Sequence, residues 1–190
     1  IISGFFGKFI GDRNSEIVTS FLVTISAILS VIVFYEVIFN QYQDNITIAT
    51  WIDSGSLNVN WSIKIDSLSA VMLVVVTSIS SLVHVYSIGY MSHDPHKPRF
   101  MAYLSLFTFA MLMLVTSDNF IQLFFGWEGV GLCSYFLIGF WFKKDTANSA
   151  AIKAFLVNRV GDFGFALGIF LIFYLFGTVN YSEVFELIPV

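Results

Sequence analysis

Glu128 is a carboxylate in an otherwise apolar stretch, and its position suggests proton or cation chemistry. It lies in the motif Gly126-Trp127-Glu128-Gly129-Val130-Gly131, within the almost wholly apolar residues 67–142. An acidic side chain at the centre of a membrane helix costs roughly 2.5–3.5 kcal/mol, and such residues commonly mark ion or proton pathways. The positions three and four residues away hold Phe124, Phe125, Gly131 and Leu132, which cannot pair with the charge. We therefore favour a functional role for Glu128 over a structural one.

Three further charged residues, Lys153, Arg159 and Asp162, follow in the next apolar stretch. Arg159 and Asp162 are spaced i, i+3, so they share a helix face and can neutralise each other. Counting back from the connector places Asp162 near the depth of Glu128, about 14 Å from the outer end at 1.5 Å per residue. A nearby cation favours a charged carboxylate, so moving that cation would switch proton binding. For Arg159 and Asp162 a structural ion pair is an equal alternative, and Lys153 could simply extend its ammonium group to the inner surface.

His84 is the fifth candidate for a proton relay. It lies 17 residues into the apolar stretch 67–91, about 25 Å from the outer end at helical rise. An imidazole with water and hydroxyls can pass protons near neutral pH, although a hydrogen-bonded structural histidine is at least as good an interpretation. The neighbouring hydroxyl residues are Thr77, Ser78, Ser80, Ser81 and Ser87.

The composition indicates that these residues lie in a membrane protein. Of the 190 residues, 57% are hydrophobic and 12% charged, whereas soluble domains average about 25% charged residues. The net charge of −4 and the lack of a basic patch argue against nucleic-acid binding. Cys133 is the single cysteine, which excludes an internal disulfide and a cysteine metal site. Lipids are therefore expected partners, and no metal or cofactor site is expected.

Apolar runs of about 20 residues predict five full transmembrane helices. They cover residues 17–39, 67–91, 99–117, 119–142 and 149–177. An apolar remnant at 1–10 is too short to span, and residue 1 is Ile, so we expect a truncated first helix and a fragment of a longer protein. Within 40–66, apolar and polar residues alternate on both sides of an Asp-Ser-Gly-Ser turn, which predicts a β-hairpin.

The expected fold class is thus an all-α polytopic membrane protein with one extramembrane β-hairpin. We divide the chain into residues 1–66, which hold the N-terminal helices and the hairpin, and residues 67–190, the start of an incomplete transmembrane domain. Lys and Arg concentrate in alternate connectors, at Lys8, Arg13, Lys97, Arg99, Lys143 and Lys144, with Lys64 alone on the opposite side. Because positive residues favour the inner face, we expect the hairpin and residues 178–190 to lie outside.

Several stretches resemble the chain 5 family of respiratory complex I, the NADH–ubiquinone oxidoreductase. The resemblance covers most of the chain and is dense from residue 66 to 170. The stretches are Asp66–Leu68, Ser80–Met91, Pro98–Ser105, Asp118–Phe120 continuing to Gly126–Gly131, and Lys153–Gly164.

The resemblance implies an antiporter-like subunit of the membrane arm, which helps to convert NADH oxidation by quinone into proton pumping. Glu128 matches the family's essential glutamate, and Lys153, Arg159 and Asp162 match charged residues on its next helix. The chain would be a subunit of an H⁺-translocating NADH:ubiquinone reductase with no redox centre of its own. NAD, FMN, iron–sulfur clusters and quinone are expected elsewhere in the complex. The expected partners are other membrane-arm subunits, especially the neighbouring antiporter-like subunit.

Two alternatives remain open at this point. The large subunit of a multisubunit Na⁺/H⁺ antiporter shares this ancestry and the membrane glutamate, but has no link to NADH. A structural scaffold would use the same charges only to hold helices together.

The richness in Phe, Ile and Asn favours the mitochondrial inner membrane over a bacterial cytoplasmic membrane.

Overall fold

The computed structural model describes residues 2–188, without the side chains of Ile2 and Lys8, and is dominated by helices. Five of them are long and apolar enough to cross a membrane, as predicted. Two shorter helices, α1 (Ile2–Ile10) and α7 (Tyr181–Leu187), lie near the chain ends. The five long helices are α2 (Asp12–Phe39), α3 (Ser67–Tyr90), α4 (Lys97–Val115), α5 (Phe120–Ile138) and α6 (Asp145–Phe176). The predicted fold class is confirmed, whereas the division of the chain at residue 66 stays a prediction.

Side-chain caps set the starts of two spanning helices. The Asp66 carboxylate accepts from the Ser69 amide, and the Ser69 hydroxyl accepts from the Asp66 amide, which makes a capping box at the start of α3. Asn119 caps α5 by accepting from the Gln122 amide at 2.8 Å. At the C-terminal end of α6, Gly177 adopts a left-handed conformation with φ of 72°, which ends the helix.

Hydropathy misplaced several helix ends. Helix α5 stops at Ile138, four residues before the predicted end, because residues 139–143 form turns although three of them are aromatic. Conversely, α2 and α6 begin five and four residues before their predicted starts, because polar residues continue the helix outside the apolar run. The short helix α7 lies in a segment for which no helix was expected.

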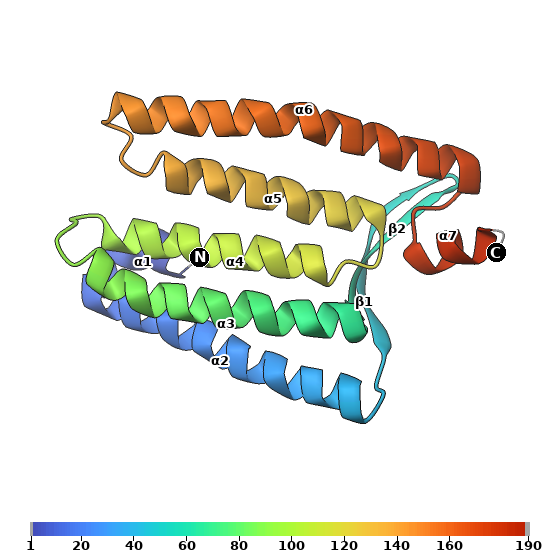
Figure 1. Cartoon of the computed structure of the whole chain (residues 1–190), viewed down its shortest axis with the longest axis horizontal. Helices are drawn as coiled ribbons and strands as arrows, with labels where there is room; N and C mark the ends of the chain where they lie inside the picture. The colour runs from blue at the N-terminus through green and yellow to red at the C-terminus, as the bar shows by residue number, and fades with distance from the viewer. Residues whose placement is uncertain (1, 189–190) are drawn as a thin grey trace.

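The long helices form an antiparallel row from α2 to α6, with α6 at one edge (Figure 1). The hairpin and α7 lie at one end of this row, which we call the hairpin end. The α3–α4 and α5–α6 connectors and the start of α2 lie at the opposite end, which we call the lysine-rich end. Helix α1 packs against α2 and α4 there.

The hairpin predicted within 40–66 is present and consists of β1 (Asp44–Ser54) and β2 (Leu57–Ile65). The strands pair antiparallel, with two register shifts in β1. Buried Val59 of β2 packs with Ile169 of α6 and with Val179. The side-chain amide of Gln122 in α5 donates to the Ser62 carbonyl at 2.7 Å and accepts from the Ser62 amide at 3.0 Å. The hairpin therefore holds the ends of α5 and α6 together.

Candidate functional site

Arg159 of α6 lies between two carboxylates. Its guanidinium forms an ion pair with Glu128 of α5, and the same Nη1 atom lies 3.6 Å from the Asp162 carboxylate. The Glu128 and Asp162 side chains are largely buried, whereas 38% of the Arg159 side chain is exposed. We call Glu128, Arg159 and Asp162 the charge cluster. Glu128, which has no partner in its own helix, thus finds one on the next helix.

Asp162 has a second partner that the sequence did not indicate. The indole N–H of Trp127 donates to the Asp162 carboxylate at 2.8 Å. Trp127 directly precedes Glu128, so Asp162 lies at about the level of Glu128, where equal counting from the connector had placed it. Asp162 is therefore fixed by a neutral donor and a cation on different helices.

An aromatic layer separates the charge cluster from the lysine-rich end. The Arg159 guanidinium lies over the Phe155 ring at 4.4 Å. Phe155 in turn contacts Tyr135 of α5, with ring centroids 5.3 Å apart. A guanidinium over an aromatic face gains cation–π attraction. This contact holds the cation on one side of the layer.

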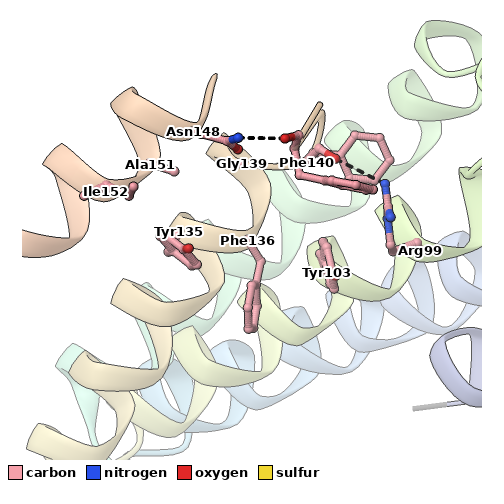
Figure 2. A pocket seen from close by; sticks show the side chains of 10 residues that line it. Arg99, Tyr103, Tyr135, Phe136, Gly139, Phe140, Asn148, Ala151 and Ile152 are labelled. Carbon is pink, nitrogen blue, oxygen red and sulfur yellow. Dashed lines mark hydrogen bonds between the residues drawn. The ribbon is translucent and has the colours of Figure 1, made fainter. Parts of the chain in front are cut away.

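Tyr135 also lines a pocket between α4, α5 and α6 at the lysine-rich end (Figure 2). The pocket has a volume of about 450 Å³. Arg99 lies at one side of it and donates to the Phe140 carbonyl at 3.1 Å, and Asn148 lies at the other side. The pocket therefore reaches toward the charge cluster as far as the Tyr135–Phe155 layer.

Lys153 does not join this cluster. Its side chain is exposed, and no carboxylate of the described residues lies within ion-pair distance of it. Its expected role as a relay residue therefore stays a prediction. No group of three or more metal-binding side chains comes together within the described part of the chain.

His84 of α3 is fully buried, away from the α5–α6 interface, and its hydrogen-bond contacts join α3 to α4. Its Nδ1 lies 2.8 Å from the Ser80 carbonyl, which can only accept, so Nδ1 carries a hydrogen. Its Nε2 lies 3.1 Å from the Ser105 hydroxyl, and that hydroxyl also lies 2.8 Å from the Met101 carbonyl. Ser105 can donate to a neutral His84, or accept from a charged one while donating to Met101. The contacts thus serve both protonation states of the imidazole.

Hydroxyl pairs continue from His84 along the faces of α2, α3 and α4. The distances between the two hydroxyl oxygens are 2.5 Å for Ser80 and Thr108, 2.9 Å for Ser81 and Thr24, and 2.7 Å for Thr77 and Ser30. Each pair joins two helices through oxygens that can donate or accept. We call these six residues, together with Ser105, the hydroxyl row. The sequence marked its α3 members, but not their partners on α2 and α4.

Two family models match the chain. The first, described as NADH-ubiquinone oxidoreductase (complex I), chain 5 N-terminus, covers residues 51–101. The second, described as NADH:quinone oxidoreductase/Mrp antiporter, TM, covers residues 117–189. The two matches include α3, most of the hairpin and the whole charge cluster.

Curated relatives match nearly the whole chain. NADH-ubiquinone oxidoreductase chain 5 of Triticum aestivum is 60% identical over 97% of this chain. NADH-quinone oxidoreductase subunit L of Rickettsia bellii is 50% identical over the full chain. The chain spans 28% and 29% of the lengths of these two relatives.

Two solved structures share the fold at lower identity. The Mrp complex from Dietzia sp. matches 96% of this chain and 19% of its own, with a TM-score of 0.76 and 23% identity. The membrane-bound sulfane sulfur reductase, an archaeal respiratory complex, matches 98% of this chain and 38% of its own, with a TM-score of 0.83 and 19% identity. The sequence similarity is far higher to the oxidoreductase relatives than to these structures. The chain belongs to the NADH-ubiquinone oxidoreductase chain 5 family and is an integral membrane protein.

Proposed function

We propose that the chain is part of a proton-translocating membrane subunit of NADH:quinone oxidoreductase. The observation that carries the proposal is the position of Arg159 between two carboxylates inside the row of membrane helices. The sequence relatives named chain 5 and subunit L support the same activity. The antiporter alternative has support from a family model that covers both classes and from a fold match at 23% identity.

The charge count of the cluster favours binding one proton. With Glu128, Arg159 and Asp162 all ionised, two negative charges face one positive charge, which leaves a net charge of −1. Uncompensated charge is costly in a low-dielectric surrounding. A single proton on either carboxylate makes the cluster neutral.

Arg159 supplies a means of controlling that proton. When the guanidinium lies against Glu128, it favours the ionised form of that carboxylate, and movement toward Asp162 favours proton uptake by Glu128. Quinone reduction elsewhere in the complex drives this movement. Each proton that crosses against the field costs about 2.3 kcal/mol per 100 mV, so the switch has to be coupled to an energy source.

The pocket at the lysine-rich end provides the approach for protons from the inner side. Its Tyr135 wall is one aromatic layer from Arg159 through Phe155. Tyr135 has a hydroxyl that can both donate and accept. Protons therefore approach Glu128 by way of the Tyr135 hydroxyl and water.

The partners we propose are the other membrane-arm subunits, with the neighbouring antiporter-like subunit foremost. We also propose the mitochondrial inner membrane as the location. The higher identity to the wheat chain than to the rickettsial chain supports this assignment. NAD, FMN, iron–sulfur clusters and quinone belong to other subunits.

The test is Glu128→Gln in the assembled, membrane-embedded complex, with the ratio of protons pumped to NADH oxidised as the readout. The matched control is Glu186→Gln, which makes the same change from carboxylate to carboxamide at an exposed position in α7. We expect the ratio to fall for Glu128→Gln and to stay normal for Glu186→Gln. A normal ratio for an assembled Glu128→Gln complex would overturn the proposal and favour a scaffold.

A native gel stained for NADH dehydrogenase activity separates the two transport alternatives. Comigration of the chain with the active high-mass band supports the oxidoreductase. Its presence only in a smaller assembly that is inactive toward NADH, with sodium-dependent transport, supports the antiporter.

A further inference from the structure

A third buried carboxylate, Glu16, lies at the lysine-rich end of α2, away from the charge cluster. It is 6% exposed, and its Oε1 lies 3.8 Å from the Lys97 ammonium, beyond hydrogen-bond distance. Among the described residues, Glu16 Oε1 has no hydrogen-bond partner, and neither do the hydroxyls of Ser15 and Ser20. Buried polar groups are normally hydrogen-bonded to protein or to water. Three such oxygens within two turns of one helix thus indicate a hydrated site.

Glu16 continues into the hydroxyl row along one face of α2. Residues 16, 20 and 24 are spaced by four, so Glu16, Ser20 and Thr24 are successive neighbours on the helix surface. The Thr24 hydroxyl lies 2.9 Å from that of Ser81 in α3. The preceding residue, Ser80, pairs through its own hydroxyl with Thr108 of α4. Thr108 lies one turn from Ser105, whose hydroxyl is 3.1 Å from His84 Nε2. Polar groups thus follow one another from the end of α2 to the buried imidazole.

The spacing along this line fits water between the side chains. Side chains four residues apart on a helix have Cβ atoms about 5–6 Å apart, a gap that one water molecule can bridge. Bridging waters are nearly as favourable as direct hydrogen bonds. The exposed part of the Lys97 side chain connects Glu16 to the solvent at the lysine-rich end.

We propose that Glu16, Lys97 and Ser20 form a proton-uptake site that feeds His84 through Thr24 and the hydroxyl row. The Glu16 carboxylate binds a proton from water at the lysine-rich end. Before this proton binds and after it leaves, the Lys97 ammonium offsets the negative charge of Glu16. The proton then leaves Glu16 to a bridging water. Each hydroxyl accepts one proton and releases one. Ser105 delivers the proton to Nε2 of His84, because Nδ1 already carries a hydrogen. Every intermediate group ends as it began, and only His84 gains the proton.

Thiol labelling tests the hydration of this site without any assumption about pumping. In sealed vesicles carrying the assembled complex, we would replace Cys133 by Ala and introduce Ser20→Cys. The probe is a charged, membrane-impermeant methanethiosulfonate, and the mass of this chain is the readout. Val23→Cys is the control, because Val23 is buried on the same helix but lies outside the line of polar side chains. We expect modification at position 20 from the lysine-rich side only, and none at position 23.

Pumping tests the transport role, and this arm rests on the proposed function. We expect Glu16→Gln to lower the ratio of protons pumped to NADH oxidised, whereas Glu36→Gln, an exposed change on the same helix, leaves it normal. Should Glu16→Gln fail to assemble, Ser20→Val blocks the line without touching the ion pair and is expected to lower the same ratio. An unmodified Ser20→Cys, or normal pumping by the assembled Glu16 or Ser20 variant, would overturn the proposal. Failure of the Glu128 test alone would leave the labelling result intact and overturn only the proposed function.

Discussion

Between α5 and α6 the buried polar side chains are mainly ions. Between α2, α3 and α4 they are mainly hydroxyls and one imidazole, apart from the Glu16–Lys97 ion pair at the lysine-rich end. The charge cluster has two carboxylates and one guanidinium, and it lies at the edge of the row, with Arg159 partly exposed. The hydroxyl row and His84 lie between three helices, and their contacts hold in more than one arrangement of hydrogens. A cluster of ions is suited to storing charge, and a row of hydroxyls to passing it on. Variants at the two interfaces should therefore fail in different ways.

The largest effect is expected for Arg159→Ala. Removing one partner of a buried ion pair typically costs 3–5 kcal/mol, because the other charge is left uncompensated. Here two carboxylates lose their cation, so both assembly and pumping should fail. Native gels report assembly, and a complex that assembles and pumps normally would contradict a role for the cluster.

A charge exchange then separates packing from transport. The double variant Glu128→Arg with Arg159→Glu keeps one ion pair between α5 and α6, so it should recover assembly lost in the single variants. It places the cation on the wrong helix, beside Trp127 instead of Phe155, so the pumping ratio should stay low. Recovery of pumping together with assembly would show that only the pair matters, as in a scaffold.

His84→Ala should have a smaller effect on stability. A hydrogen bond contributes about 1 kcal/mol net, and this change removes the contacts of the imidazole with the Ser80 carbonyl and the Ser105 hydroxyl. The melting temperature of the solubilised complex should fall while assembly persists, and pumping should fall with it. Ser78→Ala on the same helix is the control, and equal effects of both changes would argue against a special role for His84.

Gln122→Met probes the attachment of the hairpin. Each of the two hydrogen bonds to Ser62 contributes about 1 kcal/mol net, so their loss should loosen β2 without unfolding the helices. Trypsin cleavage after Lys64 should become faster. Gln43→Met, an exposed change before β1, should leave the cleavage rate unchanged.

The smallest effect is expected at α7, at the hairpin end. Hydrogen bonds from Thr178, and then from Asn180, lower the pKa of the Glu183 carboxyl below its ordinary value of 4.5. A lowered folded-state pKa gives a contribution that is complete above the ordinary value and is lost as the pH falls through the folded pKa. Amide hydrogen exchange in α7 should therefore lose protection on acidification below about 4.5. In Thr178→Val this pH dependence should weaken, and an unchanged profile would contradict the assignment.

The membrane fold follows from the sequence because apolar length and strand alternation are local properties. The starts of α3 and α5 were placed within one residue, because each apolar run begins next to the capping residue, Asp66 or Asn119. Helix rotation is not local, so counting depth found Asp162 at the right level but could not assign Arg159 to Glu128. The same limit hid Trp127 and Glu16, whose partners lie on other helices. The buried Gln122 was missed because its partner is the backbone of the hairpin.

The packing of Val59 against Ile169 and Val179 gives α6 a pivot at the hairpin end. Arg159 lies ten residues from Ile169 toward the opposite end, a lever arm of about 15 Å at helical rise. A tilt of α6 by about 10° around this pivot would carry the Arg159 backbone about 3 Å, close to the length of a hydrogen bond. A neighbour that presses on the free end of α6 could therefore break or make the ion pair with Glu128 while the hairpin stays still.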